Sequence, residues 1–296
     1  MKKIIVIPFL FFAFLLKSQS LQNVYFEDAL KIILSFKTNS LNIEDGYNKV
    51  TGNFDSNGIS LGLLQWNIGT GSLQRLVKKA GERIVLETMP KFGKDFWKAC
   101  NINTSDGLKI VNSWQIKNLV QKEQKIELEK FLSYKNVKEI QYDKALIIGK
   151  IALDNSKKWA KDMRNSDTAS FKEFVYFFDL YTFNDGLRGL WVKDVAKFKT
   201  DNANPKEIIL NWLNTREKPL YSIKDAKSNV NEWSNFSITN EKLDLFILGY
   251  LRALTSNGDT GKLKADVLNR RGTICLEKGT VHGSHYDFGV IYSKYQ

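Results

Sequence analysis

The chain contains few of the residues that build metal centres, disulfide-rich domains and proline-rich stalks. Its 296 residues include 2 histidines, 2 cysteines and 4 prolines. His282 and His285 share one short segment, so a three-histidine metal site is excluded and zinc chemistry is disfavoured. The few prolines exclude a proline-rich stalk. We expect no bound metal.

The two cysteines, Cys100 and Cys275, are far apart in the sequence. In an oxidising compartment they can pair and close a long loop. Two buried free thiols are the alternative, and the sequence leaves both open. Neither cysteine has the setting of a catalytic nucleophile.

Long hydrophobic runs are also absent, except at the N-terminus. Ile4 to Leu16 is an uncharged apolar run, preceded by Lys2 and Lys3 and followed by Ser18-Gln19-Ser20. The run is shorter than the roughly 20 residues that span a bilayer. The pattern predicts a secretory signal peptide over residues 1–20, with an uncleaved anchor or a buried helix as the alternative. We therefore expect a secreted or periplasmic protein without stable membrane insertion after cleavage.

Positive charge is in excess, with 44 Lys and Arg against 32 Asp and Glu and a net charge of +12. A basic exported protein meets anionic polymers such as cell-wall glycans, lipid head groups or extracellular nucleic acid. The sequence has no recognised nucleic-acid motif and no clustered basic stripe, so we do not expect nucleic acid as a partner.

Helical spacing of apolar residues dominates the chain after the signal peptide. It predicts a first helix over 21–36, a loop over 39–53, and one or two short strands over 59–66. Ser72 is expected to cap a further helix. Polar connections are expected over 165–170, 200–205 and 218–235. The other candidate helices are 82–89, 107–133, 143–163, 169–183, 205–215, 240–256 and 262–276. The prediction is a mainly α (α+β) fold with a small β element near the N-terminus, as a single domain over 21–296.

The densest cluster of polar and glycine residues lies between residues 52 and 67. Asp55 stands in a turn and the hydroxyl of Ser60 follows. Gln65 and Asn67 supply amides that both donate and accept, as sugar hydroxyls require. Trp66 offers an apolar face on which a sugar ring can stack. An ordinary turn is the alternative interpretation, and the spacing does not fit a calcium loop.

Three segments carry a family resemblance. Residues 50–67 read VTGNFDSNGISLGLLQWN and residues 69–74 read GTGSLQ. This stretch resembles a lysozyme-superfamily group of bacterial and phage cell-wall proteins and, more distantly, the active-site segment of the inverting chitosanases. Residues 177–186 (FFDLYTFNDG) and 267–283 (VLNRRGTICLEKGTVHG) resemble a cleft-lining helix and the C-terminal helix and turn of the same group. The resemblance implies a lysozyme-like fold.

The resemblance also implies catalytic roles. It places a water-positioning aspartate at Asp55 and an assisting hydroxyl at Ser60. An inverting glycosidase pairs such a carboxylate with a protonated one, and the group has a glutamate for this purpose after the position of Phe36. Here that position is Lys37, whose ammonium is a much weaker acid. Glu44 is a substitute acid in the following loop. The alternatives are that hydrolysis is lost and binding remains, or that another carboxylate serves.

The same resemblance suggests which residues contact a glycan. Asp179 could instead form an ion pair inside the fold, and a buried ion pair is also the alternative for Arg270 or Arg271. The residues expected to contact substrate are Lys37, Gln65, Trp66, Asn67, Asn184, Arg271 and His282.

The sequence thus predicts an exported monomer that binds amino-sugar polysaccharides, peptidoglycan first and chitosan second. The first interpretation is a glycoside hydrolase of muramidase or chitosanase type, which needs no cofactor. The alternative is a glycan-binding protein that has lost its general acid.

Overall fold

Two compact units make up the part of the chain described by the computed structural model, which covers residues 25–54, 56–183, 186–216, 220–255 and 264–296. The middle unit contains residues 37–150, and the terminal unit contains the described residues of 1–36 and 151–296. The predicted signal peptide, residues 1–20, lies outside the described residues. The single domain over 21–296 stays a prediction.

The architecture is mainly helical with small antiparallel sheets, and this confirms the predicted fold class. A helix over residues 25–38 begins the described chain. None of the helices in the described ranges combines the length and hydrophobicity of a membrane span.

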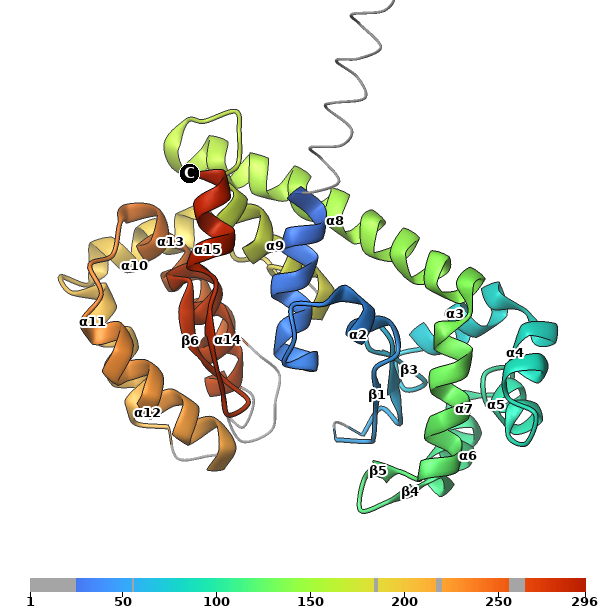
Figure 1. Cartoon of the computed structure of the whole chain (residues 1–296). Helices are drawn as coiled ribbons and strands as arrows, with labels where there is room; N and C mark the ends of the chain where they lie inside the picture. The colour runs from blue at the N-terminus through green and yellow to red at the C-terminus, as the bar shows by residue number, and fades with distance from the viewer. Residues whose placement is uncertain (1–24, 55, 184–185, 217–219, 256–263) are drawn as a thin grey trace, which may run out of the picture. The chain divides into compact units, whose positions relative to one another are not determined.

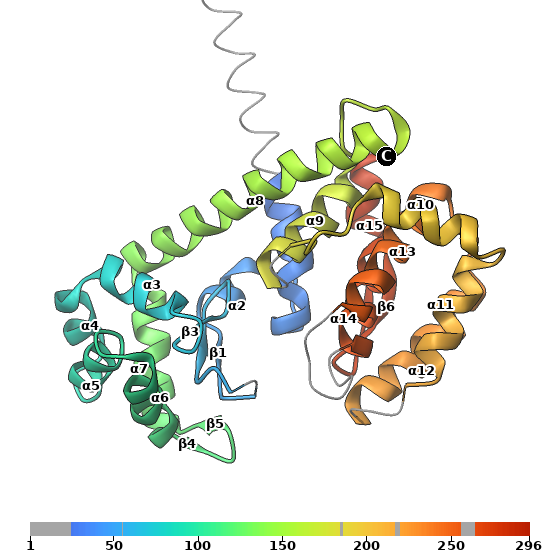
Figure 2. The same ribbon diagram turned by 180° about the vertical axis from the view of Figure 1, so that it is seen from behind.

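The middle unit is built around the antiparallel sheet β1-β2-β3, in which Val50 pairs with Leu61 and Leu61 with Trp66. Figures 1 and 2 both show α3 to α7 grouped on one side of this sheet. Helix α3 packs on β3, and α4 packs on α5 and α7. The elements are α2 (Ile43–Tyr47), β1 (Val50–Thr51), β2 (Ser60–Leu61), β3 (Trp66–Asn67), α3 (Ser72–Ala80), α4 (Glu82–Thr88), α5 (Gly93–Ala99), α6 (Thr104–Ser113), β4 (Gln115–Ile116), β5 (Leu119–Val120), α7 (Lys122–Ser133) and the start of α8 (Lys135–Arg164).

The terminal unit is centred on α14 (Lys264–Leu276), which is buried at nearly every position. This helix packs against α9, α12, α13 and β6 (Figure 2). Burial on all sides explains why its apolar stripe is less regular than that of a surface helix. The other elements are the end of α8, α9 (Phe171–Phe183), α10 (Val192–Asp201), α11 (Pro205–Asn214), α12 (Leu220–Ser234), α13 (Asn240–Leu254), β6 (Lys278–Val281), β7 (Ser284–Asp287), α15 (Gly289–Tyr292) and the 3-10 helix η2 (Ser293–Tyr295).

The predicted helix over 107–133 is wrong in its middle, where the hairpin β4–β5 separates α6 from α7. Lys117 and Asn118 form its turn with positive φ angles of 51° and 62°, as in a two-residue hairpin turn. Apolar residues recur through the hairpin at spacings that helices also show, so periodicity alone missed it.

Other boundaries also differ from the sequence-based expectation. The polar connection over 218–235 is largely α12, and the loop over 39–53 contains α2 and β1. Ser72 begins α3 but does not cap it, because Gly71 is the N-cap and the Ser72 hydroxyl donates to the Asn67 carbonyl at 3.2 Å. Helices α5 and α10 were not predicted.

Both cysteines are buried free thiols, Cys100 in the middle unit and Cys275 in α14 of the terminal unit. Of the two alternatives left by the sequence, the structure therefore contains the free-thiol state. Burial raises the pKa of each thiol to about 12, which keeps both protonated and unreactive in the folded chain.

Candidate functional site

The turn that follows β1 is fastened to the α6–β4–β5 segment of the middle unit. The Asn53 backbone N–H donates to Gln115 Oε1 at 2.6 Å, and Asn53 Nδ2 donates to Asn112 Oδ1 at 3.2 Å. Asn53 Oδ1 accepts from the Gly58 N–H at 3.1 Å. A Cβ at Gly52 would overlap the carbonyl of Asn118, so only glycine allows this close approach. The described residues Gly52, Asn53 and Gly58 are therefore fixed by specific contacts.

The central catalytic prediction, Asp55, lies outside the described residues, as does Asn184. The residue before it, Phe54, is 71% exposed. Trp66, the expected stacking platform, is buried at 6% exposure within the sheet. The exposed aromatic ring of this segment is therefore Phe54, which sequence reasoning missed. The signal for it was an aromatic residue placed between Asn53 and Asp55 in a turn.

Ser60, Gln65 and Asn67 lie together on the sheet, with Ser60 paired to Asn67 across β2 and β3. Gln65 Oε1 accepts from the Thr51 hydroxyl at 3.0 Å, and Gln65 Nε2 donates to the Gly62 carbonyl. Asn67 Oδ1 accepts from the Thr70 N–H and hydroxyl, each at 2.9 Å. The two amides therefore shape the sheet and its following turn, while the Ser60 side chain remains half-buried.

Glu44, the proposed substitute acid, forms an exposed ion pair. It lies in α2, its side chain is 61% exposed, and its carboxylate is 2.6 Å from Lys138 Nζ. A general acid needs apolar surroundings that keep it protonated, and Glu44 lacks them. Lys37 occupies the last turn of the helix over 25–38 and is half-buried.

Arg271 lies in a buried ion-pair cluster of the terminal unit. Asp179 of α9 pairs with both Arg270 and Arg271 of α14. Arg270 Nε donates to Asp179 Oδ1 at 2.7 Å, and its NH2 group donates to the Ile33 carbonyl at 2.9 Å. Asp179 and Arg271 are each 0% exposed. This arrangement matches the ion-pair alternative raised for these residues, and the Arg271 guanidinium presents no surface to a ligand.

His282 occupies the turn between β6 and β7 and faces the carboxyl end of the first helix. Its Nδ1 is 3.1 Å from the Phe36 carbonyl oxygen, and its Nε2 is 3.0 Å from Asp266 Oδ1. The neighbouring Gly283 N–H donates to Asp225 Oδ1 at 3.1 Å, and burial raises the pKa of Asp225. The imidazole, with 34% of its side chain exposed, remains open to solvent.

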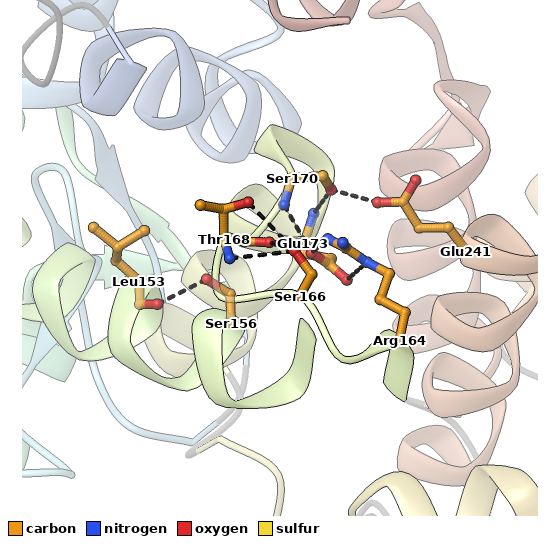
Figure 3. Close-up of polar contacts among 8 residues, drawn as sticks. All are labelled: Leu153, Ser156, Arg164, Ser166, Thr168, Ser170, Glu173 and Glu241. Carbon is orange, nitrogen blue, oxygen red and sulfur yellow. Dashed lines mark hydrogen bonds and ion pairs between the residues drawn. The ribbon is translucent and has the colours of Figure 1, made fainter. Parts of the chain in front are cut away.

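A pocket of about 280 Å³ opens in the terminal unit, and no sequence motif indicated it. Figure 3 shows three of its lining residues, Arg164, Glu173 and Glu241, together with Ser170, which contacts both glutamates. The Ser170 hydroxyl accepts from the Glu173 N–H at 3.1 Å, and Glu173 Oε2 accepts from the Ser170 N–H at 2.7 Å. This reciprocal pair is a capping box at the start of α9. The lining residues are Trp159, Met163, Arg164, Glu173, Lys199, Asn240, Glu241 and Asp244.

Burial perturbs the carboxyl groups of this pocket. Desolvation raises the pKa of Glu173, against the lowering effect of its bonds to Arg164 and Ser170. Desolvation also raises the pKa of Asp244, against its bond to Lys199. Within the described ranges, no group of three or more His, Cys, Asp or Glu side chains is arranged to hold a metal ion.

Comparisons with models of known protein families, with curated proteins and with solved structures gave no match. The functional argument therefore depends on the residues and their geometry.

Proposed function

We propose that this is an exported, monomeric glycan-binding protein whose ligand is an amino-sugar polymer of the cell wall, peptidoglycan first and chitosan second. The binding surface is the turn between β1 and β2. Its ligand is carbohydrate rather than nucleic acid, and the chain works without a cofactor.

The observation that carries the proposal is the exposed ring of Phe54 on a turn fastened by amides. An aromatic side chain that is 71% exposed loses the benefit of burial, and the preceding residue, Asn53, is anchored by three hydrogen bonds. An exposed apolar face beside amide donors and acceptors suits a sugar ring, which has apolar C–H faces and hydroxyls at its edge. The family resemblance of residues 50–67 supports the same ligand.

Binding without cleavage fits the side chains better than hydrolysis does. Lys37 stands where the resemblance implies a general acid, and Glu44 is exposed and paired with Lys138. Loss of general acid catalysis costs about 10²–10⁴-fold in rate but leaves the binding contacts in place.

The test is sedimentation of the chain with purified peptidoglycan and with chitosan, together with an assay for new reducing ends. Loss of one stacking face corresponds to about 1.4 kcal/mol, so Phe54→Ala should weaken binding about tenfold. The matched control is Val290→Ala, which truncates a 79% exposed apolar residue of the terminal unit. Equal binding of both variants would refute the assignment of the surface. Reducing ends released by the wild type and lost in Asp55→Ala would instead establish the hydrolase.

A further inference from the structure

The pocket of the terminal unit combines charged groups from four helices. Trp159 and Arg164 come from the end of α8, Glu173 from α9, Lys199 from α10, and Glu241 from the first turn of α13. A volume of about 280 Å³ is at the small end of ligand pockets. It suits a ligand no larger than a monosaccharide or an amino acid.

Both cations of the pocket are already engaged by carboxylates. Arg164 donates from Nε and NH2 to the two oxygens of Glu173, at 3.3 and 2.7 Å. Its NH2 group also donates to the Thr168 carbonyl at 3.2 Å. Lys199 Nζ donates to Asp244 Oδ1 at 2.9 Å. Neither cation is therefore available to a ligand anion without breaking an existing pair.

Glu241 differs from the other two carboxylates of the pocket. Its Oε1 accepts from the Ser170 hydroxyl, which is a neutral donor (Figure 3). Among the described residues, no lysine or arginine nitrogen lies within ion-pair distance of Glu241. Ser170 and Glu173 bond to each other in the capping box, and Lys199 forms an ion pair with Asp244. In the part of the chain that the structure describes, Glu241 thus has no cation in direct contact, although Arg164 lies near enough to interact with it electrostatically.

The charge balance of the pocket favours a positively charged ligand. With Glu173, Glu241 and Asp244 ionised, three negative charges face the two positive charges of Arg164 and Lys199. This excess is local, because the whole chain carries +12. The negative charge of Glu241 also contributes to the raised pKa of both Glu173 and Asp244. A bound cation would relieve this repulsion.

We propose that this pocket binds a small ligand bearing a primary ammonium group, with Glu241 as its counter-ion and the Asn240 amide available to a neighbouring hydroxyl. An unacetylated amino sugar has both groups, and the ammonium of an alkylamine or of an amino-acid side chain shares the first. The proposal does not depend on glycan binding by the β1–β2 turn, because it concerns other residues in the other unit.

The experiment is calorimetric titration of the full chain at near-neutral pH. Primary amines are protonated there, and a more acidic buffer would favour protonation of Glu173 and Asp244, whose pKa values are raised by burial. The probes are glucosamine, N-acetylglucosamine and butylammonium. Glucosamine should bind in the millimolar range or tighter, and its acetylated form, which lacks the charge, should bind at least about tenfold more weakly. Butylammonium binding as tightly as glucosamine would support the ammonium site and assign the sugar ring no part in it.

Glu241→Gln tests the counter-ion, because glutamine keeps the shape and can still accept from Ser170. It should lower glucosamine affinity about tenfold. The matched control Asp201→Asn makes the same charge change in α10, at an exposed carboxylate paired with Lys197, and should leave affinity unchanged. An unchanged thermal melt would show that Glu241→Gln is folded. Equal binding by Glu241→Gln, equal binding of N-acetylglucosamine, or no binding of glucosamine at tens of millimolar would each overturn the proposal.

Discussion

Replacing Asp179 by asparagine should cost the terminal unit much of its stability. Asp179 is 0% exposed, and it is the carboxylate shared by Arg270 at 5% exposure and Arg271 at 0%. Asparagine preserves the shape but removes the charge, which leaves two guanidinium groups buried without their counter-ion. Breaking a buried pair in this way costs about 3–5 kcal/mol, a large share of the roughly 5–15 kcal/mol that stabilises a domain.

The assay is urea unfolding followed by far-ultraviolet circular dichroism, with the slope of the transition checked for each variant. The control is Asp201→Asn, which removes a carboxylate from an ion pair with 52% of the aspartate side chain exposed, and an exposed pair contributes about 0–1 kcal/mol. A loss below about 1 kcal/mol for Asp179→Asn would mean that the two arginines find other compensation, and the reasoning would fail.

Two further predictions concern the two units separately. Gly52→Ala should destabilise the middle unit by about 1–3 kcal/mol, because the new methyl overlaps the Asn118 carbonyl. The rate of proteolytic cleavage within the β4–β5 hairpin should therefore rise, and an unchanged rate would contradict this prediction. The raised pKa of Glu173 means that the folded chain holds this proton more tightly than the unfolded chain does. Its contribution to stability is therefore complete below the ordinary carboxyl pKa of 4.5 and is lost as pH rises through the raised value. In Glu173→Gln, the free energy of unfolding should fall less steeply as pH rises across the acidic range. An unaltered pH dependence of this free energy would contradict the prediction.

Local sequence signals located several helices of the fold, although they missed α12. Sequence pattern located α9 and α11 within a few residues. Helix α11 has an apolar face that packs inward, whereas α9 is a mostly apolar run buried from Phe171 to Leu180. Helix α12 escaped prediction because two of its inward side chains, Asp225 and Asn229, are polar. Asn229 is 0% exposed and donates to Asn269 Oδ1 and to the Thr280 carbonyl. A polar residue satisfied by tertiary contacts looks like a solvated one in the sequence.

The sequence predicted where along the chain the candidate site lies, but not which side chains it exposes. The glycines and amides of residues 52–67 indicated a turn beside short strands, which the structure contains. Which aromatic ring faces solvent depends on packing, and the structure buries Trp66 and exposes Phe54. The pocket of the terminal unit left no sequence signal, because its side chains come from four helices separated along the chain.

The two cysteine thiols can report separately on the opening of each unit. Cys100 is buried in the middle unit and Cys275 in the terminal unit, and neither is oxidised. An alkylating reagent therefore reacts with a given cysteine only after the surrounding unit opens. Peptide mapping of the labelled chain would separate the opening rates of the two halves without introducing any mutation, and the chain can be refolded without an oxidant.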